Sequence, residues 1–223
     1  MQEQQDLWRV RLTFAKGEAL KYISHLDLAR AWERLFRRAG LPVAYSQGFN
    51  PRPRFQIASG LPVGVTGQAE LLDVWLAERL APEEVLARLG PASPPGLEIL
   101  AAEEVELRAP ALQARMQAAD YLAVLDTAEP AEAIRTRVEA LLAAPSLPRQ
   151  RHHKGKQQSY DLRPLVQSLA VRPAPSGGGI LLEMRLQASP EGAGRPDQVL
   201  DVLGLTLVAR SIERTKLHFD FDK

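Results

Sequence analysis

The stretch Trp-Arg-Val-Arg-Leu-Thr-Phe at residues 8–14 decides how the N-terminal part of the chain folds. Apolar side chains alternate with polar ones, the period-two pattern of a strand that buries one face. Ser24 and Asp27 then resemble a capping box, in which the serine oxygen accepts an early backbone N–H of a helix. The helix is expected to run to about Ala39, where a glycine and a proline stop it. A strand followed by an amphipathic helix therefore opens the fold.

The elements that follow this helix complete the order of a known fold. Extended segments are expected at residues 54–58, 70–76 and 97–107, and a helix begins at Pro82. Strand, helix, strand, strand, helix, strand is the ferredoxin-like order, a compact sheet with its helices on one face. The same order recurs further along the chain, so we predict an α+β fold made of two ferredoxin-like (βαββαβ) halves in tandem. The elements expected in the second half are strands at 121–126, 180–186 and 205–219, helices at 131–143 and from Pro196, and a short helical or extended element at 161–169.

The domain organisation follows from this repeated order. Residues 1–108 are expected to form an N-terminal ferredoxin-like domain, residues 119–223 a C-terminal one, and residues 109–118 the linker between them. A chain of 223 residues is long enough for two such domains. Its 45% hydrophobic and 25% charged residues are ordinary for a soluble globular protein.

The absence of cysteine from the sequence restricts the chemistry of the chain. It excludes disulfides, thiolate zinc sites and any iron–sulfur cluster held by the chain's own cysteines. The four histidines do not form a metal-ligand pattern, because His152 and His153 are adjacent and generally point apart, while His25 and His218 are distant in sequence. We therefore predict no metal site.

The N-terminus, the hydropathy and the charge of the chain add further expectations. The first six residues are polar, and no apolar run reaches the length of about 18 residues that a bilayer requires. We expect no signal peptide, no membrane partner and a cytoplasmic location. The net charge is only +1, so any site for an anionic partner must be a local cluster of cations.

Residues 45–64 are the segment most typical of a binding site. Three prolines and three glycines shape its backbone, and arginines and amides stand beside aromatic side chains. This mixture suits a surface that stacks on and hydrogen-bonds a flat or anionic ligand. We interpret the segment as the outer wall of a site that begins just before the first helix. The candidate ligand contacts are Lys21, Tyr22, His25, Gln47, Phe49, Asn50, Arg52 and Arg54.

His25 and Asp27 are the candidate catalytic residues. They lie at the start of the first helix and fit a polar cluster for ligand contact or proton transfer. Asp27 equally fits a carboxylate that caps the helix, and His25 a partly exposed turn residue. The sequence leaves both interpretations open.

Cationic residues form three candidate contacts to nucleic acid. Arginines on the polar face of the first helix, a basic run at 149–156 and one face of the last strand each present several positive charges. Pairing such cations with phosphates releases counterions and so favours binding. Each group equally fits a solvated surface. The residues concerned are Arg30, Arg34, Arg37, Arg149, Arg151, Lys154, Lys156, Arg210, Arg214 and Lys216, with His218 expected on the same strand face as the last three.

A resemblance to a known family rests on five motifs: Tyr-Ile-Ser-His-Leu-Asp-Leu at 22–28, Arg-Arg-Ala-Gly-Leu-Pro at 37–42, Ser-Gln-Gly-Phe-Asn-Pro-Arg-Pro at 46–53, Leu-Pro-Val-Gly at 61–64 and Leu-Leu-Asp-Val at 71–74. On these motifs the chain resembles the radical-SAM-linked domain family of unknown function. Members are fused behind, or encoded beside, radical SAM proteins of the cobalamin-binding type. The resemblance implies a radical SAM protein as partner, with the iron–sulfur cluster and SAM in that partner and no cofactor in this chain. It implies no reaction, because the family has no assigned activity.

Three classes of function remain open. The one we favour is an accessory or substrate-binding protein that works with a separate radical SAM enzyme in RNA or ribosome-related modification, with tRNA or rRNA as a further partner. The second is a metal-independent RNA-processing or RNA-modifying enzyme. In that case His25 or His153 acts as acid or base in cleavage, or Asp27 as nucleophile in pseudouridine formation. The third is a protein–protein adaptor that uses the segment at 45–64 as its contact.

Overall fold

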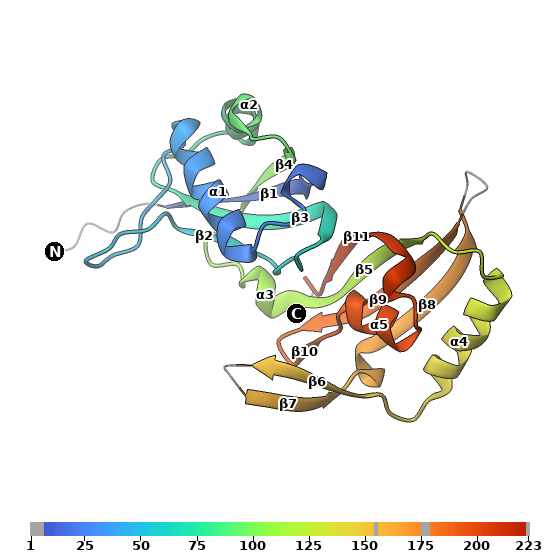
Figure 1. The fold of residues 1–223 in the computed structure, drawn as a ribbon. Helices are drawn as coiled ribbons and strands as arrows, with labels where there is room; N and C mark the ends of the chain where they lie inside the picture. Colours follow the sequence, from blue (N-terminus) through green and yellow to red (C-terminus); the bar gives the residue numbers. More distant parts are fainter. Residues whose placement is uncertain (1–6, 154–155, 175–178, 222–223) are drawn as a thin grey trace. The chain divides into compact units, whose positions relative to one another are not determined.

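The computed structural model of the protein describes residues 7–153, 156–174 and 179–221. The chain divides into two compact units, an N-terminal unit of residues 1–115 and a C-terminal unit of residues 116–223. Each unit combines a β-sheet with α-helices (Figure 1), so the predicted α+β class is confirmed. The segment expected as a linker is not an open connector, because a short helix, α3 (Leu112–Arg115), and the first residues of strand β5 (Met116–Leu125) occupy most of it.

The sheet of the N-terminal unit is antiparallel. Strand β1 pairs with β3 on one side and with β4 on the other, and β2 pairs with the other edge of β3. The order across the sheet is therefore β2-β3-β1-β4. Helix α1 connects β1 to β2, and α2 connects β3 to β4. The elements are β1 (Trp8–Lys16), the 3-10 helix η1 (Glu18–Leu20), α1 (His25–Arg38), β2 (Phe55–Ile57), β3 (Val65–Leu76), α2 (Pro82–Ala92) and β4 (Leu97–Val105).

The core of the N-terminal unit lies between this sheet and its two helices. The alternation predicted at residues 8–14 is confirmed, because Val10, Leu12 and Phe14 are buried in that core. The ring of Phe14 meets Trp32 edge-on, with 5.0 Å between ring centroids, and Trp32 lies 5.3 Å from Phe36. Each such fully buried side chain stabilises the unit by about 1.5–3 kcal/mol. The buried residues of α1 are Leu28, Trp32, Leu35 and Phe36.

The other face of the same sheet carries a buried ion-pair cluster. The Asp73 carboxylate, which has no solvent exposure, accepts hydrogen bonds from Arg9 Nη2 at 2.5 Å and from Arg11 Nε at 2.8 Å. Arg9 also donates to the backbone oxygens of Ala109 and Pro110. These bonds fasten the chain that follows β4 across the polar face of the sheet.

The C-terminal unit follows the succession strand, helix, strand, strand, helix, strand, with one hairpin inserted. Its main sheet is antiparallel and has the order β8-β9-β5-β11, with the short β10 pairing beside β9. Strands β6 and β7 form a separate two-stranded sheet. The elements after β5 are α4 (Ala131–Ala143), β6 (Pro148–His153), β7 (Lys156–Asp161), η2 (Arg163–Leu165), β8 (Val166–Pro173), β9 (Ile180–Ser189), β10 (Gly192–Ala193), α5 (Pro196–Val202), η3 (Thr206–Val208) and β11 (Ala209–Phe219).

The inserted hairpin is the main departure from the expected order of this unit. The basic run at 149–156 belongs to β6 and β7, which pair in antiparallel register from Pro148 opposite Asp161. The element expected at 161–169 is a 3-10 turn that leads directly into β8. The sequence did not indicate this hairpin, because its strands carry charged and amide side chains in place of the apolar alternation that marks a half-buried strand.

Candidate binding surface

The edge of the N-terminal sheet is interrupted by a hairpin. The backbone N–H of Ala44 donates to the oxygen of Trp75 at 2.7 Å, and the N–H of Trp75 donates to the oxygen of Arg54 at 3.0 Å. The chain therefore leaves the sheet after Ala44 and returns at Arg54, opposite the same residue of β3. Residues 45–53, the motif hairpin, are an insertion at this point and lead away from the sheet (Figure 1).

Backbone hydrogen bonds close the motif hairpin. Tyr45 and Pro53 form a β-bridge. The N–H of Ser46 donates to the oxygen of Arg52 at 2.9 Å, and the N–H of Arg52 donates to Ser46 Oγ at 3.0 Å. At the turn, Gly48 has a φ of +128°, a conformation that only glycine adopts without strain. The hairpin is thus ordered by its own backbone.

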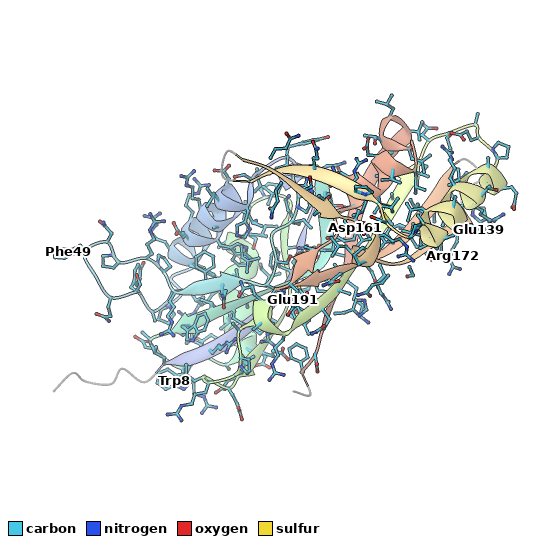
Figure 2. The ribbon with its side chains drawn as sticks, turned by 90° about the horizontal axis from the view of Figure 1, so that it is seen from below. Trp8, Phe49, Glu139, Asp161, Arg172 and Glu191 are labelled. Atoms are coloured by element: carbon cyan, nitrogen blue, oxygen red, sulfur yellow. The ribbon has the colours of Figure 1, made fainter. Side chains whose placement is uncertain are left out.

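The aromatic side chains of the motif hairpin face solvent. Phe49 lies at its tip and is fully exposed, with a relative exposure of 105% (Figure 2), and Tyr45 is 55% exposed. Gln47 and Asn50 are exposed beside them. Large aromatic groups without cover are an informative departure from ordinary surfaces, because burial would stabilise them. Three predicted contact residues, Gln47, Phe49 and Asn50, therefore lie together with Tyr45 on one accessible element.

The two arginines of this segment differ in how firmly they are held. The Arg54 guanidinium carbon lies 4.8 Å from the centroid of the Trp75 ring, close enough for a cation–π contact. This contact restrains the Arg54 side chain and lowers the conformational entropy that it loses on gripping an anion. Arg52 is exposed on the hairpin itself.

The remaining motif residues gather at the start of α1. The buried Lys16 ammonium donates to the backbone oxygens of Lys21 at 3.2 Å and Val65 at 3.3 Å. The N–H of Gly64 donates to the same Lys21 oxygen at 3.0 Å, and Gly64 has a φ of +85°, which favours glycine. These bonds join the Leu-Pro-Val-Gly motif to the Tyr-Ile-Ser-His motif.

Of the candidate contacts at this end, Lys21 is buried whereas Tyr22 and His25 are exposed. The Lys21 ammonium lies 3.4 Å from the Glu18 carboxylate and 5.8 Å from the centroid of the Tyr22 ring, so it is already engaged. His25 lies over Gly60, where an added Cβ atom would come within 3.9 Å of its Nδ1 atom. The Lys21 ammonium is therefore held within the unit, whereas Tyr22 and His25 are open to solvent.

Three exposed apolar side chains, those of Tyr22, Leu26 and Val63, lie near this end of α1 and are referred to as the apolar patch. Their relative exposures are 75%, 68% and 59%. The hydrogen bond between Gly64 and Lys21 joins the segments that carry Val63 and Tyr22, and Leu26 follows His25 on the first turn of α1. Leu26 and Val63 were not among the predicted contacts. The signal for Leu26 was available, because it lies off the stripe that the helix buries.

The capping box predicted at the start of α1 is confirmed. Ser24 is the N-cap residue, and its Oγ atom accepts the Asp27 N–H at 3.2 Å. The Ser24 hydroxyl also donates to Asp27 Oδ2 at 2.7 Å, and Arg30 donates to Asp27 Oδ1 at 3.0 Å. The hydrogen bonds from Ser24 and then from Arg30 lower the pKa of Asp27. The carboxylate is thus engaged as a helix cap.

The two groups of candidate contacts lie at different points of the sheet edge. The motif hairpin leaves the sheet opposite Trp75, whereas His25 and the 61–64 motif lie beyond the far end of β2. The extended segment from Arg54 to Ala58 alone spans about 13 Å. The interpretation of the hairpin as a wall of the site at Lys21 and His25 therefore needs correction, because a strand of the sheet separates them.

The arginines of α1 have different surroundings. Arg30 is paired with Asp27. Arg34 and Arg37 are exposed, and Arg38 donates to the backbone oxygen of Ala92. All three predicted arginines of this helix are therefore exposed, and Arg30 is engaged by a carboxylate.

In the C-terminal unit, Arg149 and Arg214 are not open to a nucleic acid, contrary to the prediction. Arg149 donates to Gln198 Oε1 at 3.2 Å and pairs with Asp201, so it is fastened to α5. Arg214 is only 1% exposed, because an irregularity between Arg214 and Lys216 breaks the strand alternation. The prediction that Arg214 shares an exposed face with Lys216 is therefore wrong.

Two other predicted cations of this unit are accessible. Arg210 and Lys216 are exposed on β11. The remaining candidate side chains of the basic run lie outside the described residues, namely Arg151, His152, His153, Lys154 and Lys156.

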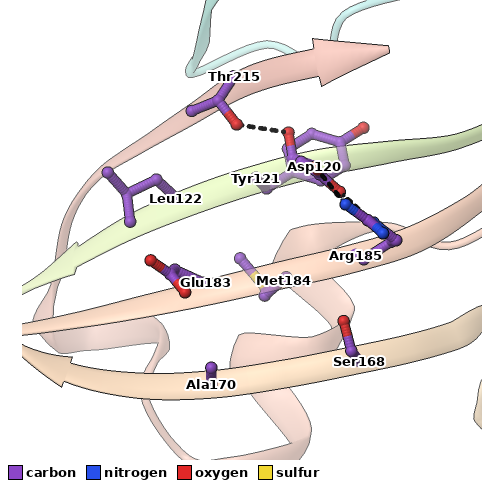
Figure 3. Close-up of a pocket in the computed structure, with 9 residues that line it drawn as sticks. All are labelled: Asp120, Tyr121, Leu122, Ser168, Ala170, Glu183, Met184, Arg185 and Thr215. Atoms are coloured by element: carbon purple, nitrogen blue, oxygen red, sulfur yellow. Dashed lines mark hydrogen bonds and ion pairs between the residues drawn. The ribbon is translucent and has the colours of Figure 1, made fainter. Parts of the chain in front are cut away.

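The C-terminal unit has a shallow pocket of about 310 Å³ on its sheet (Figure 3). Arg185 donates to both carboxylate oxygens of Asp120, at 2.7 and 2.9 Å, and His218 Nε2 lies 2.8 Å from Asp120 Oδ2. The bonds from Arg185 and then from His218 lower the pKa of Asp120. Beside this cluster, Arg172 pairs with Glu183 at 2.9 Å. The carboxylates of Asp120 and Glu183 are therefore each paired with an arginine of the same unit.

Within the described residues, no group of three or more His, Asp and Glu side chains is placed to hold a metal ion. In the same part of the chain, no helix combines the length and the apolar character needed to cross a membrane.

Comparisons with known proteins identify a family. The model of the family described as "Uncharacterized protein conserved in bacteria (DUF2344)" matches residues 9–196. No curated protein matches the chain. Among solved structures, a chain of "Crystal Structure of a Cbf5-Nop10-Gar1 Complex" is similar at 13% sequence identity and a TM-score of 0.47, over 94% of this chain and 48% of that chain. This chain therefore spans about half the length of the solved chain that it matches.

Proposed function

The chain belongs to this family of uncharacterized bacterial proteins, and from that premise we propose that it is an accessory, substrate-binding protein that works with a separate radical SAM enzyme. The iron–sulfur cluster and SAM belong to the partner, because this chain has no cysteine to hold a cluster. The partner acts in the cytoplasm on RNA or on a ribosomal component, with tRNA or rRNA as the substrate that this chain holds. Its radical SAM character is inferred from the motif resemblance given above.

One observation supports the accessory role: exposed motif residues lie in two separate groups, and the Asp27 carboxylate is engaged by its own helix. Asp27 is engaged as the cap of α1 with Ser24 and Arg30. His25 is exposed beside Gly60. The neighbouring motif residues leave an apolar patch and an aromatic hairpin open to solvent. Such surfaces suit recognition of another molecule better than proton transfer.

We also propose that both units have the ferredoxin-like fold. The support is the order of strands across each sheet, which is β2-β3-β1-β4 in the N-terminal unit and β8-β9-β5-β11 in the C-terminal unit. Along the chain, each main sheet also has one helix before its second strand and one before its fourth. In this reading the motif hairpin and the β6–β7 hairpin are insertions into a common framework.

The apolar patch of Tyr22, Leu26 and Val63 is the surface that we assign to the partner enzyme. An exposed apolar patch rimmed by polar groups is typical of a protein contact. The backbone that carries the patch is held in place, because the buried Lys16 ammonium and the Gly64–Lys21 hydrogen bond join the segment of Tyr22 to the segment of Val63. A pre-formed surface loses less entropy on docking.

The test is capture of the partner by the tagged full-length chain from lysate of its own host. We expect a cluster-containing radical SAM protein, detected by its iron and sulfide content, to be retained by the wild type. The double variant Tyr22→Ser, Leu26→Ser should lose it.

The matched control is Leu207→Ser, which also removes a fully exposed apolar side chain, but from the C-terminal unit. Capture by the control should equal that of the wild type. The proposal fails if the wild type retains no cluster-containing protein, or if the double variant retains as much as the control.

A further inference from the structure

We propose that the motif hairpin, residues 45–53, together with Arg54 binds single-stranded RNA, with bases stacked on Phe49 and Tyr45 and phosphates paired with Arg52 and Arg54. This deepens the proposed function, on which it rests, by naming the element that holds the substrate and the chemical class of that substrate.

The aromatic groups of the motif hairpin fit bases better than they fit a protein pocket. Phe49 is fully exposed, and its chain neighbours are Gly48, Asn50 and the rigid Pro51. An anchor of a protein interface normally stands within an apolar patch that excludes water around it. A stacking platform needs only an exposed ring face, and single-stranded nucleic acids use aromatic side chains in this way.

The charge of the surrounding sequence favours an anionic ligand. Residues 34–69 contain five arginines and no acidic residue. Arg54 is held by its contact with Trp75, and Arg52 is exposed on the same hairpin. No carboxylate of this stretch competes with a phosphate for either guanidinium. By contrast, the arginines on the sheet face of the C-terminal unit, Arg172 and Arg185, are paired with carboxylates.

The motif hairpin is closed by its own hydrogen bonds and carries polar groups that suit base edges. The reciprocal bonds between Ser46 and Arg52 fix the hairpin before binding, so little backbone entropy is lost when a ligand docks. The exposed amides of Gln47 and Asn50 offer donors and acceptors to base edges beside the ring of Phe49. Bases of a duplex are already stacked and paired, so the same surface should prefer single strands.

The experiment measures binding of a labelled single-stranded oligouridylate of about 12 nucleotides, within the range of known single-strand sites, by fluorescence anisotropy. Phe49→Ala should weaken binding roughly 5- to 150-fold, the loss typical of one stacked base, and Phe49→Trp should restore it. The double variant Arg52→Ala, Arg54→Ala should reduce the slope of log affinity against log salt by about 1.4, since each phosphate contact contributes about 0.7.

Matched controls remove the same kinds of group elsewhere. Leu207→Ala deletes a fully exposed apolar side chain, and Arg135→Ala deletes an exposed cation of α4. Both should bind the oligonucleotide as the wild type does. Far-ultraviolet circular dichroism and the thermal midpoint of each variant establish that it is folded.

Three results would overturn the inference: no binding by the wild type at about 50 mM salt, wild-type binding by Phe49→Ala, or equal binding of a duplex of the same length. Capture of the partner enzyme is scored on the same variants. If Phe49→Ala loses the enzyme and keeps the RNA, the hairpin is a protein contact and the inference is wrong, while the accessory role stands. If RNA binding behaves as expected and no enzyme is captured, the accessory role fails while the RNA contact stands.

Discussion

The two units treat the polar face of their sheets in opposite ways. In the N-terminal unit this face carries Arg9, Arg11 and Asp73, and all three side chains are at least nine-tenths buried. In the C-terminal unit it carries Asp120 and Arg185, whose side chains are 24% and 47% exposed. Both faces pair an arginine with an aspartate through close hydrogen bonds. They differ in whether the chain covers them.

The cover of the N-terminal face comes from the residues after β4. Arg9 donates to the backbone oxygens of Ala109 and Pro110, and Gln113 Nε2 donates to the oxygen of Ile57 at 2.6 Å. The arginine thus satisfies the carboxylate and the covering backbone at once. A buried charge pair contributes to folding only when such additional bonds satisfy its remaining polar groups. The cover and the charge cluster therefore depend on each other.

This difference shows that ion pairs of similar geometry can contribute unequally to the free energy of unfolding. A covered pair leaves an uncompensated charge in the interior when one partner is removed, whereas an exposed pair leaves a charge that water solvates. Stability in this protein should consequently be most sensitive on the polar face of the N-terminal unit, and least sensitive on that of the C-terminal unit.

The largest effect is expected for Asp73→Ala. The substitution removes the only carboxylate bonded to both Arg9 and Arg11 among the described contacts, and leaves two buried guanidinium groups without it. We expect the free energy of unfolding to fall by about 3–5 kcal/mol. Urea denaturation followed by tryptophan fluorescence measures the loss.

The matched control is Asp120→Ala, which removes the equivalent carboxylate from the exposed pair. Its loss should not exceed about 1 kcal/mol. Equal losses for the two variants would contradict the proposed difference between a covered and an exposed pair.

A smaller effect is expected for Arg9→Met. Arg11 still pairs with Asp73 in this variant, so the carboxylate keeps a partner, but the bonds to Ala109 and Pro110 are lost. We expect a loss of about 1.5–3 kcal/mol, the range for hydrogen bonds made by a charged group. Hydrogen–deuterium exchange should rise most at residues 106–113. Unchanged exchange there would mean that Arg9 does not hold the cover.

The framework of each unit was predictable from local patterns. The alternation at residues 8–14, the capping residues Ser24 and Asp27 and the apolar stripe of α1 all occur within one element, and local periodicity reports them directly. The burial of Arg214 was not predictable, because the strand irregularity that turns it inward depends on pairing with β5. Asp73 stands alternate to buried apolar residues, but only the structure reveals the arginines that meet it.

The candidate site was predictable in composition and not in arrangement. The residues of the motif hairpin were recognised from their mixture of prolines, aromatic groups and arginines. Their separation from His25 was not, because it depends on Ala44 and Arg54 pairing with the same residue, Trp75. Nearness in sequence suggested one site, whereas the sheet register places β2 between two contact regions.

The exposed pair of the C-terminal unit should reveal itself through pH. Arg185, and then His218, lower the pKa of Asp120, so the carboxylate stabilises the fold above its unfolded-state pKa of about 3.9. That contribution is lost as the pH falls through the lower pKa of the folded state. The wild type should exceed Asp120→Asn in unfolding free energy by up to about 1 kcal/mol near neutral pH. Urea denaturation near neutral pH and again in acid should show that the difference shrinks in acid. A difference that stays constant would mean that ionisation of Asp120 is not its cause.

The smallest effect is expected for the pair of Arg172 and Glu183 on the same face. Their side chains are 64% and 43% exposed, although the nitrogen and oxygen lie only 2.9 Å apart. Water and salt screen such a pair, and ordering two long side chains offsets much of the attraction. A double-mutant cycle of Arg172→Ala and Glu183→Ala should give a coupling energy of about 0.2–1 kcal/mol, smaller still at high salt. A coupling energy larger than the loss of unfolding free energy in Arg9→Met would show that the distance between the charges, and not their burial, determines how much an ion pair stabilises this protein.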